Sequence, residues 1–272
     1  MSTHVLTGPD PTAQAGLRFY PLRDSATMLR RNLKRMLRYP SMTLMLVGMP
    51  VVFLLLFVYV FGGTLGAGLN GRGGYVNYLA PGIIVIAVTS VAVPTAVAVN
   101  VDMTEGIINR FRTMAIARVS VLTGHVAGSV IQAVLSAGLV AGVAVLVGFR
   151  PAAGPGQWIA AFAVLAMVAF ALTWVSVALG LMARTPASAS NLPMPLSFLP
   201  FLGSAFVPAA SMSAGLRWFA EYQPFTPVIE TLRGLLTGTA IGDQALIAVA
   251  WCAGLSLAGY LWARAVYNSG GR

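Results

Sequence analysis

The sequence predicts an all-α polytopic membrane protein with six transmembrane helices. Of its 272 residues 57% are hydrophobic and only 9% are charged, whereas about a quarter of the residues of a soluble globular protein are charged. A bilayer core of about 30 Å needs roughly 20 apolar residues as a helix. Runs such as 47–61 and 134–147 are apolar on every side, which excludes the alternating strands of a membrane barrel. Uncharged windows long enough for one span each occur at 39–71, 73–101, 119–149, 151–183, 185–216 and 244–263.

The chain before the first span divides into two parts. Residues 1–23 are predicted to be a disordered cytoplasmic tail, because their first part holds Gly, Pro, Thr and Gln without apolar periodicity. Residues 24–40 predict an amphipathic helix lying in the membrane interface. The alternative is that its charges only orient the chain. Its apolar and basic faces are Leu29, Leu33, Met36 and Leu37 against Arg30, Arg31, Lys34, Arg35 and Arg38.

Residues 41–265 form the predicted six-span domain, and 266–272 a cytoplasmic tail. Proline inside a membrane helix removes a backbone donor and kinks the helix. We therefore expect kinks at Pro50 and Pro94, and an irregular fifth span that faces protein. In span three, two pairs of glycines four residues apart predict close helix packing, namely Gly124 with Gly128 and Gly138 with Gly142. The spans are placed at 42–61, 79–101, 121–147, 157–182, 191–207 and 244–263.

Two connections between spans have helical patterns of their own. Residues 102–120, between spans two and three, carry an apolar stripe and predict a short cytoplasmic amphipathic helix. In 208–243, between spans five and six, Thr226-Pro227 predicts a helix start and Gly238 a stop. We therefore expect helices at 228–237 and 216–222 that dip back into the outer leaflet. The residues that mark these outer re-entrant helices are Glu221, Gln223, Glu230 and Arg233.

The basic residues orient the spans. With the amino terminus inside, 13 of the 17 Lys and Arg residues fall on the inner side and four fall outside, as the positive-inside rule requires. This topology places both termini in the cytoplasm and also accounts for the formal charge of +10 without nucleic-acid binding. The four outer residues are Arg72, Arg150, Arg217 and Arg233.

The residues needed for catalysis are sparse. A P-loop needs a lysine after its second glycine, and the single lysine, Lys34, lies in another context. His125 has no nearby histidine or cysteine as a metal co-ligand, and Cys252 can form no internal disulfide. No carboxylate falls near the middle of a predicted span, which argues against ion-coupled transport. A channel-like or externally powered permease remains.

Two stretches resemble ABC-2 type permeases, particularly drug exporters of the daunorubicin-resistance type. One departure from the family pattern is Ala115, where such proteins often have proline. The resemblance covers about residues 25–265. The first stretch holds Asp102, Glu105-Gly106, Arg110-Phe111-Arg112, Met114, Arg118 and Gly124. The second holds Phe198-Leu199-Pro200-Phe201, Ser204-Ala205-Phe206-Val207-Pro208, Glu221-Tyr222-Gln223-Pro224-Phe225-Thr226-Pro227 and Glu230-Thr231-Leu232-Arg233.

The resemblance implies the membrane subunit of an ATP-driven exporter in a bacterial plasma membrane, with no catalytic residue or cofactor of its own. Two copies would form the pathway, and two separate ATP-binding subunits would hold ATP and Mg. The implied coupling surface is Glu105, Arg110, Phe111, Arg112 and Arg118, and the implied pathway lining includes Phe53, Phe57, Phe198 and Phe201.

A pathway without fixed charge predicts a large apolar or amphipathic cargo, such as an antibiotic or a lipid. Three alternatives stay open. The chain could export polysaccharide or glycolipid, it could be a membrane scaffold that recruits a soluble partner through 102–120, or it could be a passive channel.

Overall fold

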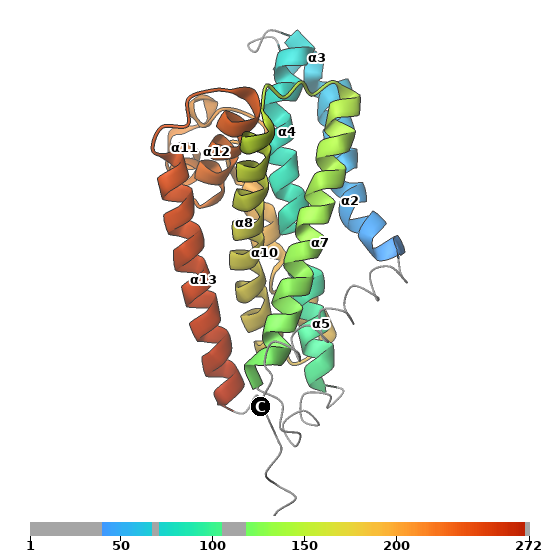
Figure 1. Cartoon of the computed structure of the whole chain (residues 1–272), viewed down its shortest axis with the longest axis vertical. Coiled ribbons are helices and arrows are strands. Elements are labelled where there is room, and N and C mark those ends of the chain that lie inside the picture. The colour runs from blue at the N-terminus through green and yellow to red at the C-terminus, as the bar shows by residue number, and fades with distance from the viewer. Residues whose placement is uncertain (1–39, 67–70, 105–117, 270–272) are drawn as a thin grey trace, which may run out of the picture.

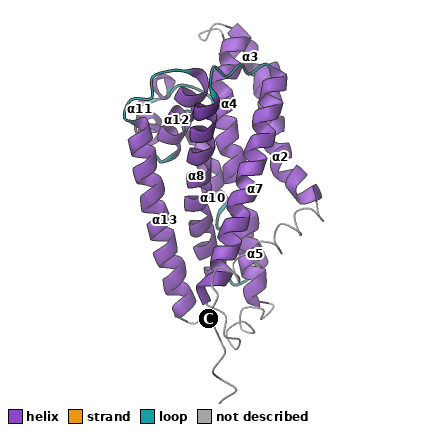
Figure 2. Cartoon of the chain, in the orientation of Figure 1, coloured by secondary structure: helices purple, strands orange, loops and turns teal. Residues whose placement is uncertain are grey.

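The computed structural model describes residues 40–66, 71–104 and 118–269, and every regular element in these ranges is a helix (Figures 1 and 2). Five helical stretches are long and apolar enough to cross a membrane. They correspond to the predicted spans one, two, three, four and six, so the all-helical membrane fold class is confirmed. The five are Leu46–Leu65, Gly73–Thr104, Leu122–Val147, Pro155–Met182 and Gln244–Asn268.

The predicted fifth span, 191–207, is not one of these five. The chain there forms short pieces, α9 (Pro186–Asn191), α10 (Met194–Phe198) and the 3₁₀ helix η3 (Leu199–Leu202), followed by turns. Three prolines in this stretch remove backbone donors, so a continuous helix would leave carbonyls without partners. The expected irregularity is confirmed, but none of the described helices in this stretch is long enough to cross a membrane.

The first span changes its helix type near its end. It consists of α2 (Pro40–Leu55), the π-helix η2 (Leu56–Phe61) and α3 (Gly62–Leu65). Pro50 lies inside α2. A π-helical segment of six residues is rare, and such segments are frequent at functional sites. This segment carries Phe57, Tyr59 and Phe61.

The second span is broken into α4 (Gly71–Thr89) and α5 (Ala92–Thr104). The break at 90–91 lies one turn before Pro94, whose missing N–H would have bonded the Ser90 carbonyl. The hydroxyls of Thr89 and Ser90 both donate to the Ile86 carbonyl at 2.9 Å. The predicted kink at Pro94 is therefore confirmed.

The long helices pack side by side around α8 (Figure 1). This helix, Pro155–Met182, lies against α13 (Gln244–Asn268), against α5 and against α7 (Arg118–Val147). On the other side, α2 packs on α7 and α4. The core between them is apolar; its largest fully buried side chains include Tyr75, Leu79, Ile83, Ile84, Phe149, Ile229 and Leu232.

Both helices predicted in 208–243 are present. They are α11 (Ala214–Tyr222) and α12 (Phe225–Thr237), after a short 3₁₀ turn, η4 (Ala209–Ser211). Gly238 ends α12 at φ 77°, and its N–H donates to the Gly234 carbonyl, which is the expected stop. Both helices lie at one end of the bundle, called here the α12 end, whereas α13 ends at the opposite, C-terminal end (Figure 1).

Close helix approach is seen at glycines outside span three, whereas the approach predicted at Gly138 and Gly142 is not found. The packing predicted at Gly124 and Gly128 stays a prediction. Gly259 of α13 lies against the backbone of Trp174 and Val175 in α8. In contrast, a methyl group at Gly142 would meet no atom of the chain within 4 Å. Gly180 of α8, like Gly259, lies close to the backbone of a neighbouring helix, at Ala96 in α5, and Gly82 of α4 lies against Ala205 in the turns after η3.

We predict that Gly259→Ala destabilises the protein by about 1–3 kcal/mol, because the added methyl forces α13 away from α8. The matched control is Gly254→Ala on the same helix, where the methyl would meet no atom within 4 Å. Thermal unfolding of the purified variants in detergent measures the difference. Equal unfolding temperatures for the two variants would contradict this account.

Candidate functional site

Five phenylalanine rings form a continuous cluster. They come from the first span and from residues 191–207, which we call the broken segment. The rings of Phe53 and Phe201 meet edge to face with centroids 5.3 Å apart. Phe57 lies 4.3 Å from Phe206 by the same measure. Phe201 stacks on Phe206 at 5.3 Å and lies 6.0 Å from Phe198. The cluster thus joins α2 and η2 to α10 and η3.

Phe61 extends this cluster by a sixth ring. It is the last residue of the π-helix, and its centroid lies 5.4 Å from that of Phe57. We call these six rings the aromatic cluster: Phe53, Phe57, Phe61, Phe198, Phe201 and Phe206.

The aromatic cluster has a buried side and an open edge. Phe206 is 8% exposed, whereas Phe198 is 58% and Phe61 is 41% exposed. The rings between them are half-buried. Aromatic faces bind other apolar and aromatic groups by stacking and dispersion. The open edge therefore offers an uncharged aromatic surface to a molecule outside this chain.

The structure brings together all four residues predicted to line a pathway, Phe53, Phe57, Phe198 and Phe201. Their role in a pathway stays a prediction. Sequence reasoning missed Phe206, because five residues along a regular helix turn a side chain about 140° away from Phe201. The break after η3 removes that restriction.

Arg233 of α12 contacts two other parts of the chain at the α12 end. Its side chain is 6% exposed. Its Nε and Nη2 each donate to the Tyr78 carbonyl at 3.2 Å, and Nη2 also donates to the Ser204 carbonyl at 2.8 Å. The guanidinium lies 3.7 Å from the centre of the Tyr78 ring, and Nη1 pairs with Glu230. Arg233 thus joins α12 to α4 and to the segment that carries the aromatic cluster.

The other two residues predicted for the outer helices take separate positions. Glu221 pairs with Arg217 on the exposed side of α11, at 2.8 Å. Gln223 is 4% exposed, and its side-chain amide has no hydrogen-bond partner in the described part of the chain. The amide nitrogen lies so close to Gly203 that a methyl group there would overlap it.

A buried polar pair near the C-terminal end was missed. We expected Asp102 in a polar cytoplasmic connection, but it lies inside α5 and is 8% exposed. Its Oδ2 lies 2.8 Å from Nε2 of His125 on α7, which is 7% exposed. The second span therefore extends further than predicted and contains a carboxylate.

The predicted coupling residues cannot be placed in this geometry. Glu105, Arg110, Phe111 and Arg112 lie outside the described residues, as do residues 24–39 of the predicted interface helix 24–40. Arg118 is the first residue of α7, but its side chain is outside the described part as well.

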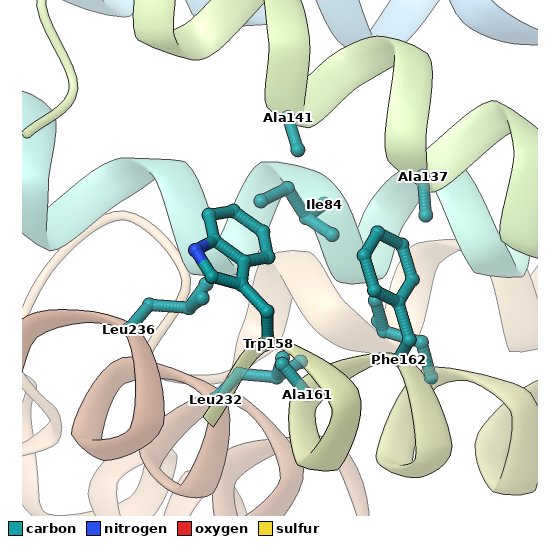
Figure 3. Close-up of a pocket in the computed structure, with 9 residues that line it drawn as sticks. Ile84, Ala137, Ala141, Trp158, Ala161, Phe162, Leu232 and Leu236 are labelled. Atoms are coloured by element: carbon teal, nitrogen blue, oxygen red, sulfur yellow. The ribbon is translucent and has the colours of Figure 1, made fainter. Parts of the chain in front are cut away.

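Figure 3 shows a small apolar cavity between α4, α7, α8 and α12. The ring of Trp158 and the ring of Phe162 stand over it, with centroids 5.9 Å apart. Its volume is about 10 Å³, which is about the room that one water molecule needs and far below that of a typical site for a drug-sized molecule. This cavity cannot enclose a large organic compound.

Five long apolar helices and a stretch of short helices packed against the first of them define a polytopic α-helical membrane protein. Residues 24–237 match the family model for ABC-2 type transporters. The match covers well over half of the chain, so the chain belongs to the ABC-2 type transporter family, which confirms the predicted family.

The chain is also similar to a protein from Streptomyces coeruleorubidus, the daunorubicin resistance ABC transporter permease protein DrrB1. The two are 29% identical over 215 residues, which cover 79% of this chain and 75% of that protein.

Proposed function

We propose that this chain is the membrane subunit of an ATP-driven exporter that moves a large apolar or amphipathic organic compound out of a bacterial cell. Two copies of the chain form the pathway, and two separate ATP-binding subunits supply the energy. The family and the drug-resistance permease among its relatives support this proposal.

The aromatic cluster is the observation that best supports the proposed class of transported compound. Its open edge, at Phe198 and Phe61, is apolar and aromatic. Uncharged rings bind an organic compound by stacking and cannot neutralise a charged polymer. Because the cavity inside one chain is small, we place the pathway between the open edges of two copies.

Co-purification and transport test this function. The chain is expressed with ATP-binding subunits encoded beside it, purified, and reconstituted into lipid vesicles. The complex should hydrolyse ATP and move a fluorescent apolar dye, whereas the chain alone should hydrolyse none. A complex that moves only a saccharide-linked lipid favours the glycolipid alternative. A chain that binds a soluble partner but transports nothing favours the scaffold.

The proposed orientation places the α12 end outside the cell. In a Cys252→Ala background, a cysteine at Gly215 should react with an impermeant thiol reagent in intact cells, because Gly215 lies exposed on α11. A cysteine at Ala187, exposed on α9, should react only after lysis. Labelling of the Ala187 position in intact cells would contradict the orientation.

The proposed coupling surface is tested by charge reversal. If residues 104–118 bind in a groove of the ATP-binding subunit, Glu105→Lys or Arg112→Glu should weaken assembly by about 2–5 kcal/mol. If lipid alone holds the segment, Ile107→Asp and Phe111→Asp should matter instead, because single surface charges cost only about 1 kcal/mol each. Pull-down of the ATP-binding subunit measures both. Wild-type binding and transport in both charge reversals would refute the coupling role.

A further inference from the structure

Two polar bridges join α5 to α7 near the C-terminal end of the bundle. The hydroxyls of Thr95 and Ser129 are hydrogen-bonded at 2.8 Å. Seven residues further along α5, Asp102 meets His125 at 2.8 Å. The later residue on α5 thus pairs with the earlier residue on α7, which is the pattern expected of two antiparallel helices. We call these four residues the polar tie.

The polar tie lies in apolar surroundings. Val99 of α5, between the two bridges, is fully buried, and Leu122 and Val126 of α7 are 4% and 3% exposed. These side chains pack mainly against α8. The two helices touch α8 far more extensively than each other, so the polar tie is their main direct connection.

A polar or charged group buried among apolar side chains is costly unless it has a partner. If Asp102 and His125 only filled space between the helices, two apolar side chains of similar size would stabilise the fold as well. The position of the pair points to another role. It lies at the two helix ends that flank residues 105–117, where α5 ends at Thr104 and α7 begins at Arg118.

We propose that the polar tie makes α5 and α7 move as one body, so that a pull on the connection between them is transmitted to the spans. The four residues are positioning residues, since they act through the helices and do not touch cargo. Asn100 holds the same part of α5 against the end of α8, because its amide nitrogen donates to the carbonyls of Gly180 and Ala183. The proposal rests on the exporter function proposed above.

The first test separates transmission from folding. Asp102→Ala and His125→Ala should each lower the amount of compound exported per ATP hydrolysed by at least about fivefold, the lower end for coupling between sites. Removing one partner of a buried pair also lowers stability, so the ratio is compared at equal amounts of purified complex, whose ATP hydrolysis should stay near wild type. The exchange Asp102→His with His125→Asp restores the pair and should recover the ratio. Ser176→Ala is the control, because its buried hydroxyl donates to Leu172 of its own helix.

The second test does not depend on the charged pair. Thr95→Cys with Ser129→Cys, in a Cys252→Ala background, allows the two helices to be bridged by oxidation or by a short thiol reagent. If α5 and α7 move together, the bridged complex should transport at the rate of the reduced one.

Several results would overturn the proposal. These are a wild-type export ratio in both alanine variants, a loss of complex that the exchange does not rescue, or a block of transport by the bridge at 95 and 129. A wild-type complex that exports nothing would refute the exporter function itself, which is a different outcome.

Discussion

Replacing Arg233 by alanine should destabilise the protein by about 3–5 kcal/mol, the cost of breaking a buried charge network by removing one partner. The carbonyls of Tyr78 and Ser204 would lose their charge-assisted hydrogen bonds, leaving Ser204 only the Tyr78 hydroxyl as a donor, and Glu230 would lose its partner. Water cannot replace these bonds in an apolar interior. Export should be lost together with stability, since Ser204 lies between Phe201 and Phe206 of the aromatic cluster.

The chain offers a matched control for this prediction. Arg217 pairs with Glu221 on the neighbouring helix, but both side chains are about half exposed. An exposed pair of this spacing contributes only about 0.3–0.5 kcal/mol, so Arg217→Ala should change little. Thermal unfolding in detergent compares the two. We expect a fall of about 10 °C for Arg233→Ala; similar falls for both variants would show that the network is not the cause.

The spans could be predicted because lipid restricts the choice of structure. Long uncharged apolar windows must become helices, and five of the six predicted spans correspond to spanning helices. The fifth span was placed because 185–216 carries no charge. That criterion does not register Pro193, Pro195 and Pro200, where the backbone cannot keep the hydrogen bonds of a continuous helix. The same prolines did predict its irregularity.

The aromatic cluster could be predicted only in part. Phe53, Phe57, Phe198 and Phe201 came from a resemblance and from their position in the spans. Phe206 depended on a break in the helix, which is a tertiary effect. Phe61 lies four residues after Phe57, a spacing that brings two side chains together on a regular helix as well, so the sequence did contain a signal for it.

The pair of Asp102 and His125 was missed for a different reason. Charge was used to place the end of span two, so a charged residue inside the span was excluded by construction. A buried partner 23 residues away makes that position acceptable. The contacts predicted at Gly138 and Gly142 failed similarly, because the pattern of small residues four apart does not say which helix face meets a neighbour.

Replacing Phe201 by leucine should lower export about tenfold, because Phe201 is the central ring of the aromatic cluster. It contacts Phe53, Phe198 and Phe206, and an aromatic pair contributes about 0.5–1.5 kcal/mol beyond its buried area. Leucine keeps most of the volume, so assembly with the ATP-binding subunit should persist.

Phe162→Leu is the matched control for that loss. Phe162 is also half-buried and also stacks on another ring, that of Trp158, but it lines the small cavity between α7 and α8 (Figure 3). Dye transport by the reconstituted complexes, at equal protein amounts and with ATP hydrolysis measured alongside, compares the two variants. If the rings of the aromatic cluster contact the cargo, only Phe201→Leu lowers export and its ATP hydrolysis without cargo stays unchanged. Equal export by both variants would mean that the cluster only packs the first span against the broken segment.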